Sequence, residues 1–433
     1  MKIAGKLAVK SKVEKVPFFG KAKIDRFRLS NGLRLMVVQN PLAPVFSYQT
    51  WYNVGSRDEE EGKSGLAHLF EHMMFKGTKK RKQGVYDRTL EQSGARDLNA
   101  FTGTDYTAYV QSLPREHLEL VAELECDRMT GLYITKSQFE SEREVVRNER
   151  KQRTENNPEG QMYEELQKMA FEVHPYGRPV IGYEKDLDAM NVDDCYAFYR
   201  EHYSPNNAVI CVIGDVKPER ALHLIEKHYG KIPTCKSLPH VPAEEPEQKE
   251  RRVVALNLPL QVEKTYAAYK IPNAMSQDQP ALSLLSIILS TGRSSRLYRA
   301  LTDKGHTIDI SAGGGGGKDP GLYYISFTCQ QGRRSEDCLA LVEEEFAKIL
   351  SEGLKESELE RAKNKVQMET YQSLLSNSSI AHFIGSNEIV MGSMEAALEE
   401  IALMKKVSSS DVQRVVRTYF RPERQTVVIG RPQ

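Results

Sequence analysis

The chain has 433 residues, of which 40% are hydrophobic and 27% charged, and this length predicts two or more domains because a single hydrophobic core rarely grows so large. Its formal net charge of +1 gives no reason to expect nucleic acid or an anionic membrane as a partner. The longest apolar run, from Ala281 to Ser290, is about half as long as a membrane span, so none is predicted.

The N-terminal segment and the cysteines bear on the compartment. The first 21 residues are basic but lack the apolar stretch of about 7–15 residues that a signal peptide carries. The six cysteines are scattered and form no C-x-x-C pair, so reduced thiols are expected. Both observations favour the cytoplasm, and the periplasm is the alternative if a signal was removed before residue 1.

The first half of the chain alternates strand and helix patterns. Asn31 and Gly32 separate two strand-like runs, which predicts a hairpin with a type I′ turn. A third strand pattern follows at 45–54. Helical periodicity then predicts helices at 64–76, 85–93, 115–132, 136–154, 159–171, 191–202 and 217–229, with a strand at 206–216 between the last two.

A segment rich in proline and glutamate follows, at 237–252, and its composition is typical of a linker. After it the strand and helix patterns start again, with a buried helix near Leu284 and long helices from about 334 to 419. The linker predicts domains at 1–236 and 253–433.

Two pairs of glycines indicate that the halves are copies of one unit. Gly214 and Gly430 each follow an isoleucine in a strand pattern and are 216 residues apart. Gly77 and Gly292 each end a helix pattern and are 215 residues apart. We therefore predict a duplicated α+β fold, in which each domain has a mostly antiparallel sheet packed with helices. Coincidence between two generic stretches is the alternative.

Two histidines and a glutamate crowd the segment HLFEH, which begins at His68. His68 and His72 are four residues apart and share a helix face, and Glu71 lies at its edge. Two imidazoles can bind a zinc ion, and an adjacent carboxylate can act as general base toward a water molecule. The alternative is an ordinary buried face, but burying three polar groups without a purpose is costly.

A third zinc ligand has to come from elsewhere in the chain. Glu142, Val145, Val146 and Glu149 follow the spacing of one helix stripe, so two carboxylates share a face with two valines that we expect to point inward. Surface ion pairs are the plainer interpretation of such a helix. Spacing alone does not choose between the two glutamates as a ligand.

HLFEH, followed by Glu149 at 77 residues beyond His72, resembles the pitrilysin/insulinase family of zinc peptidases. The resemblance covers nearly the whole chain and implies half of a clamshell made of two such two-domain units. It implies one Zn²⁺ per chain, held by His68, His72 and Glu149, with Glu71 as general base. Glu142 resembles the family's supporting carboxylate.

By the same resemblance, Asn99, Ala100 and Phe101 lie at an exposed strand edge and contact the substrate. An extended peptide adds to such an edge through backbone hydrogen bonds, which suits unstructured peptides of varied sequence. An ordinary hairpin with Asn99 in a turn is the alternative.

The second half departs from the family pattern. The family's facing unit carries an arginine and, seven residues later, a tyrosine, but this chain has Thr302 and Asp309 there. Arg296 and Arg299 lie nearby, so a shifted alignment is the alternative. We expect the zinc-bearing subunit of a heterodimer whose homologous partner carries the Arg/Tyr pair, or otherwise a homodimer.

In the second half of the repeat, the positions that correspond to the metal-site residues are occupied by Ser283, Ser286 and Ile287. This predicts a single zinc site per chain. The sequence therefore predicts a zinc endopeptidase acting on peptides or unfolded segments. The alternative function is a non-catalytic structural subunit of the same family.

Overall fold

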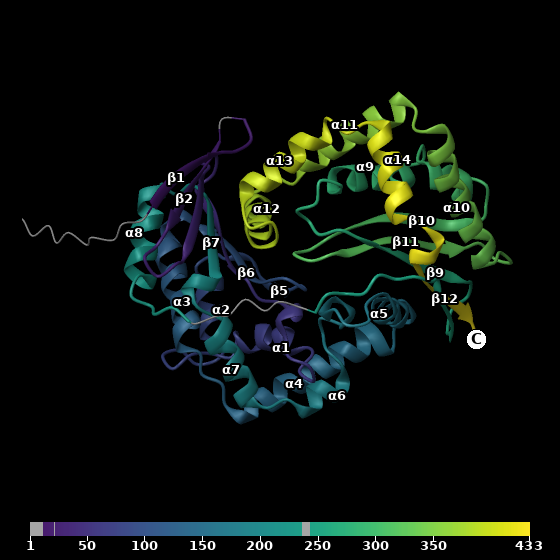
Figure 1. The fold of residues 1–433 in the computed structure, drawn as a ribbon. Helices are drawn as coiled ribbons and strands as arrows, with labels where there is room; N and C mark the ends of the chain where they lie inside the picture. The colour runs from purple at the N-terminus through teal and green to yellow at the C-terminus, as the bar shows by residue number, and fades with distance from the viewer. Residues whose placement is uncertain (1–11, 21, 236–242) are drawn as a thin grey trace, which may run out of the picture. The chain divides into compact units, whose positions relative to one another are not determined.

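The structure is a computed structural model that describes residues 12–20, 22–235 and 243–433 (Figure 1). The described residues form two compact units, and each is discontinuous in sequence. The first comprises the described residues of Met1–Val146, Val180–His240 and Ser373–Met394, and the second those of Arg147–Pro179, Val241–Gln372 and Glu395–Gln433. The predicted domains 1–236 and 253–433 refer to a repeat in sequence, and they stay a prediction.

Each unit contains one sheet. The strands of the first are β1 (Lys12–Pro17), β2 (Lys23–Arg28), β3 (Arg34–Gln39), β4 (Val45–Tyr52), β5 (Arg96–Thr102), β6 (Thr107–Pro114) and β7 (Ala208–Gly214), in the order β1-β2-β3-β7-β4-β6-β5. The strands of the second are β8 (Arg252–Leu258), β9 (Lys264–Ile271), β10 (Thr307–Gly315), β11 (Gly321–Cys329) and β12 (Gln425–Pro432), in the order β10-β11-β9-β12-β8.

The two sheets share one topology. In the first sheet β3 pairs in parallel with β7, and the remaining neighbours β4, β6 and β5 follow in antiparallel pairs. In the second sheet β8 pairs in parallel with β12, and β9, β11 and β10 follow in the same way. Strands β7 and β12 contain the Ile-Gly pairs at Gly214 and Gly430. The predicted fold class, two similar α+β units with mostly antiparallel sheets, is confirmed.

The α-helices surround these sheets. Their bounds are α1 Leu66–Met73, α2 Val85–Gln92, α3 Leu118–Gly131, α4 Lys136–Arg150, α5 Pro158–Ala170, α6 Glu184–Ala189, α7 Val192–His202, α8 Pro218–Tyr229, α9 Gln279–Ser290, α10 Ser335–Glu352, α11 Glu356–Gln372, α12 Asn377–Val390, α13 Met394–Met404 and α14 Ser409–Tyr419. None of the described helices is long and apolar enough to cross a membrane.

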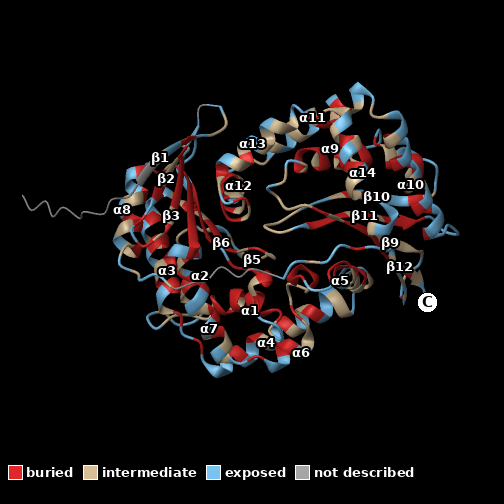
Figure 2. Ribbon diagram, viewed as in Figure 1, coloured by how far each residue is buried: buried red, intermediate tan, exposed pale blue. Residues whose placement is uncertain are grey.

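Two helices pack in the unit opposite to their place in the sequence. Helix α12, from late in the chain, covers β4 and β7 of the first unit, and helix α5, from the first half, covers β12 and β9 of the second. Since β4 corresponds to β9 and β7 to β12, the exchange is reciprocal. It explains why all of β7 is buried: α12 covers one face, and helices including α3 and α8 pack in the core on the other (Figure 2).

Two local predictions were wrong. Asn31 does not have the positive φ of a type I′ turn; the N–H of Gly32 donates to the carbonyl of Leu29, and Gly32 alone turns left-handed, at φ +87°. The connection is a longer turn with a bulge, which matches the strand twist equally well. Val145 is 47% exposed, so of the two valines only Val146 points inward.

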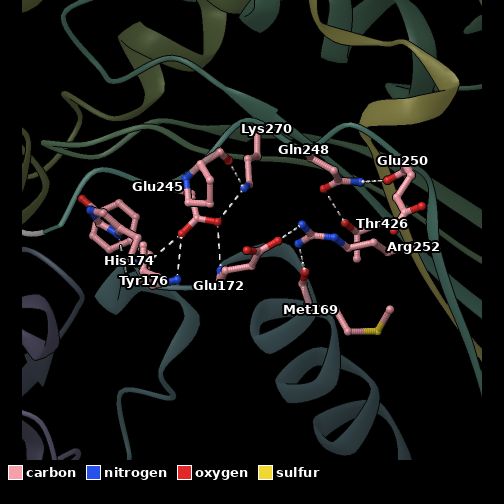
Figure 3. A network of polar contacts seen from close by, with 12 residues as sticks. Met169, Glu172, His174, Tyr176, Glu245, Gln248, Glu250, Arg252, Lys270 and Thr426 are labelled. Carbon is pink, nitrogen blue, oxygen red and sulfur yellow. Dashed lines mark hydrogen bonds and ion pairs between the residues drawn. The ribbon is translucent and has the colours of Figure 1, made fainter.

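The residues of the predicted linker that the structure describes, from 243 on, belong to the second unit, and Figure 3 shows the polar contacts of Glu245 among them. Their irregular path is fixed by Glu245, whose carboxylate accepts hydrogen bonds from three consecutive backbone N–H groups at 172–174, at 2.8–3.0 Å. Lys270 donates to the same carboxylate at 2.7 Å. None of the six cysteines, all of them among the described residues, forms a disulfide in the structure.

Candidate functional site

Helix α1, which carries the HLFEH segment, begins at a strictly constrained position. Gly65 has φ +90°, and a Cβ there would overlap the backbone of the loop before α6. The carboxylate of Glu59 accepts hydrogen bonds from the N–H groups of Gly65, at 3.0 Å, and Ala67, at 2.8 Å. Ser64 donates to Asp186 at 2.5 Å. These contacts satisfy helix N–H groups that would otherwise lack partners, and they fix the start of the helix.

The predicted site residues of α1 lie on one face of the helix. The imidazole rings of His68 and His72 are 4.8 Å apart, and His68 and Glu71 are buried. The core beneath them is closed by the apolar side chains Leu66, Leu69, Phe70 and Met73, none of which is more than 4% exposed. The helical spacing in the sequence therefore gives a polar face on an otherwise apolar helix.

Glu142 on helix α4 orients His72. Its Oε1 lies 2.9 Å from Nδ1 of His72, and its Oε2 lies 2.5 Å from Nζ of Lys76. Burial alone would raise the pKa of Glu142, but hydrogen bonds from His72 and Lys76 hold it below the ordinary carboxyl value. With Nδ1 engaged by this carboxylate, Nε2 is the nitrogen of His72 that would bind a metal, as in the carboxylate–histidine pairs of zinc sites.

Glu149 completes a group of three possible metal ligands. Helix α4 continues without a break past the boundary at Val146, and Glu149 lies one turn beyond it. One ligand atom from each of His68, His72 and Glu149 lies within 4.8 Å of the other two. Zinc binds such ligands at about 2 Å, so small side-chain rotations would let all three meet one ion. Arg153 lies 3.0 Å from Glu149 and is its ion-pair partner.

The fit of the donor set to zinc is good, because two imidazoles and one carboxylate leave a fourth position for water. No second group of this kind occurs within the parts of the chain that the structure describes. Ser283, Ser286 and Ile287 lie on α9 of the second unit, and the hydroxyl of Ser286 donates to a carbonyl of its own helix.

The predicted substrate residues lie on the outermost strand of the first sheet. Asn99, Ala100 and Phe101 are part of β5, which pairs with β6 on one side and ends the strand order on the other. Helix α1 packs beside this strand. The next residue, Thr102, donates a hydrogen bond from Oγ1 to Oε2 of Glu71 at 2.6 Å.

Three residues at this site were not identified from the sequence: Lys76, Thr102 and Glu59. Lys76 lies three residues beyond the end of α1, in the turn that follows the helix. Thr102 and Glu59 approach α1 from a strand and from a loop. Neither position can be deduced from the periodicity of a helix.

In the second half, the positions where a substrate-holding arginine and tyrosine would stand make other contacts. Arg296 makes two hydrogen bonds to the carboxylate of Glu358, at 3.0 and 2.9 Å. Thr302 bonds to Thr307, and Asp309 accepts the N–H of Thr328. These contacts are structural, and none of them places an arginine beside a tyrosine.

Comparisons with known proteins find similar chains that are named as peptidases. Residues 34–184 match the family described as Insulinase (Peptidase family M16), and residues 189–366 match Peptidase M16 inactive domain. The zinc protease PqqE of Helicobacter pylori is 29% identical over 428 residues, which are 95% of this chain and 93% of that protein. The beta subunit of the mitochondrial-processing peptidase of Lentinula edodes is 25% identical over 90% of this chain and 86% of its own.

The fold agrees as well. The crystal structure of a protease from Helicobacter pylori superimposes with a TM-score of 0.89 and 27% sequence identity, covering 98% of this chain and all of that one.

Proposed function

Because the chain belongs to the insulinase family of peptidases, family M16, we propose that it is a zinc-dependent endopeptidase that cleaves peptides or unfolded segments of proteins. The convergence of His68, His72 and Glu149 beside Glu71 is the observation that carries the proposal. A structural subunit would have no use for three converging ligands, and a buried carboxylate next to them is costly to retain without a role.

Each residue of the site has a distinct task. Bound zinc supplies a Lewis acid that polarises the scissile carbonyl and makes a water molecule easier to deprotonate. Glu71 takes the proton of that water and can return it to the leaving amine. Glu142, together with Lys76, holds the imidazole of His72 in the tautomer that binds metal.

The substrate is proposed to bind as an extra strand beside β5. Asn99, Ala100 and Phe101 would then meet a peptide backbone near the zinc ligands, because α1 packs beside this strand. Such binding uses main-chain hydrogen bonds and requires an extended substrate, so folded proteins would be poor substrates.

The chain is further proposed to work with a homologous partner subunit. Thr302 and Asp309 stand where a substrate-holding arginine and tyrosine would be, and Arg296 is engaged by Glu358. A homodimer would lack the pair in both copies. Residues 189–366 match a domain described as inactive, which is consistent with this division of labour.

The test is hydrolysis of an unstructured quenched-fluorescence peptide by the purified chain loaded with one equivalent of zinc. Turnover that Glu71→Gln abolishes while zinc stays bound supports the proposal. The control is Glu61→Gln, an exposed carboxylate ahead of α1, which should leave turnover unchanged.

If zinc binds but the chain alone is inactive, the assay is repeated with a homologous chain that carries the Arg/Tyr pair. Turnover by the mixture supports the heterodimer. Continued inactivity there favours the structural subunit and overturns the proposed activity.

A further inference from the structure

We propose that Thr102 is a positioning residue for the general base, and this inference rests on the proposed function. Its hydroxyl holds the carboxylate of Glu71 in one orientation and connects it to the strand that binds substrate. The basis is the 2.6 Å hydrogen bond from Oγ1 of Thr102 to Oε2 of Glu71.

The surroundings of Thr102 direct its proton toward Glu71. The facing residue across the hairpin is Thr107, which is fully buried and donates its own hydroxyl proton to the carbonyl of Val54 at 3.0 Å. The two threonine hydroxyls are 3.5 Å apart, a much weaker contact than the bond to Glu71. An ionised carboxylate accepts hydrogen bonds and donates none, so the bond to Glu71 is the stronger, charge-assisted one.

A fixed carboxylate is valuable at this position. A glutamate side chain rotates about three bonds, and a general base must lie within about 3 Å of the proton that it takes. With Oε2 held by Thr102, rotation of the carboxylate of Glu71 about its last bond is restricted. Catalysis depends strongly on such orientation, because a group that is already in place loses no freedom during the reaction.

The position of Thr102 in β5 also connects the general base to the proposed peptide-binding strand. It directly follows Asn99, Ala100 and Phe101 in β5, so the strand that binds the peptide also holds the base. A peptide that aligns against β5 would therefore meet a base already set for attack. The expected effect of losing the hydroxyl is on the chemical step and not on binding of the peptide.

The experiment compares Thr102→Val, Thr102→Ser and the control Ser112→Ala in the form that hydrolyses peptide, alone or with its partner subunit. Valine keeps the branched shape and removes the hydroxyl, and serine keeps the hydroxyl. The hydroxyl of Ser112 bonds to Asp97 elsewhere in the same hairpin, so its loss tests mere weakening of the hairpin.

We expect Thr102→Val to lower kcat about 10- to 100-fold, with KM changed less than about twofold and zinc fully retained. Thr102→Ser should recover kcat to within about threefold of wild type, and Ser112→Ala should not change it. An unchanged kcat in Thr102→Val, or a serine variant as slow as the valine one, would overturn the inference.

A second readout does not depend on turnover. A hydroxamate group binds zinc and can share a proton with a carboxylate at the position of Glu71, so the affinity of a peptide hydroxamate reports where that carboxylate is. Calorimetry should show about tenfold weaker binding to Thr102→Val and unchanged binding to Thr102→Ser and Ser112→Ala. Equal affinity for all variants would refute the positioning role, whereas an inactive wild type that binds the hydroxamate would refute only the proposed activity.

Discussion

At the scale of single residues, the two glutamates of α4 are told apart by their partners. Both were candidates from their spacing. Glu142 is engaged by Nδ1 of His72 and by Lys76, which suits a carboxylate that supports a ligand. Glu149 converges with His68 and His72. The geometry therefore favours Glu149 as the ligand and Glu142 as the support of His72, which is the division that the family resemblance implies.

Glu149→Gln should abolish stoichiometric zinc binding, because an amide is a poor zinc ligand and two histidines alone hold the ion weakly. Glu142→Gln should still bind zinc, but about 10- to 100-fold more weakly, since only the support of His72 is lost. Metal content after dialysis against a buffered zinc concentration measures both.

The control for both variants is Glu144→Gln, an exposed carboxylate of the same helix, which should bind zinc like the wild type. Full metal occupancy in Glu149→Gln would show that another residue is the third ligand.

At the scale of elements, local patterns predicted most helices and strands, although not β1, β8 or α6, and they did not predict which elements pack together. Helix α1 was predicted because its apolar residues repeat with the helical period, and β7 because seven residues in a row are suited to a buried strand. The bond between Thr102 and Glu71 joins residues 31 positions apart, and its direction depends on how β5 passes α1. No pattern in either segment encodes that approach.

The exchange of α12 and α5 was missed for the same reason. Both segments have helical patterns, but an apolar helix face in the sequence does not say which sheet it covers. The contact that settles it for α12 is Gly385, where a Cβ would overlap the indole of Trp51. Gln49 adds a hydrogen bond to the carbonyl of Ser378 at 3.0 Å.

Gly385→Ala should therefore destabilise the first unit. In an isolated helix alanine is favoured over glycine by about 1 kcal/mol, so a loss of stability would report the overlap with Trp51. We expect a loss of about 1–3 kcal/mol, typical of overpacking. Trp51 is the only tryptophan in the chain and is fully buried, so its emission should shift to longer wavelength as α12 moves away.

Ser386→Ala is the matched control for that experiment, because its hydroxyl bonds to a carbonyl of its own helix. It should leave the emission of Trp51 unchanged. A Gly385→Ala protein with wild-type emission and stability would mean that the helix does not pack this closely.

At the scale of the whole molecule, duplication was visible in the sequence because the strands that end in Ile-Gly recur at a fixed distance. The compact units were not visible, since they are assembled from segments that alternate along the chain. Each unit has its own core, because these apolar clusters of described residues each lie wholly within one unit. Because cooperative unfolding requires shared packing, two units with separate cores should unfold in separate transitions.

Thermal unfolding followed by Trp51 emission and by circular dichroism should test whether the two units unfold separately. It should also test whether Glu245 stabilises the second unit. Trp51 reports on the first unit alone, and far-ultraviolet circular dichroism reports on both. Glu245→Gln removes a carboxylate that accepts three backbone N–H groups and Lys270, so it should lower the stability of the second unit by about 2–3 kcal/mol and its Tm by roughly 5–8 °C. The Trp51 transition should not move, and the neighbouring exposed Glu244→Gln should change neither.

The same carboxylate predicts how the second unit responds to acid. Burial alone would raise the pKa of Glu245, but the bonds from Lys270 and the backbone lower it below the ordinary value. Its contribution is therefore complete above the unfolded carboxyl pKa of about 4.3 and is lost as the pH falls through the lower, folded pKa. The difference in Tm between wild type and Glu245→Gln should be constant near neutral pH and shrink below about pH 4. A difference that persists unchanged in acid, or a Trp51 transition that moves together with the dichroism, would show that Glu245 does not stabilise the second unit in this way.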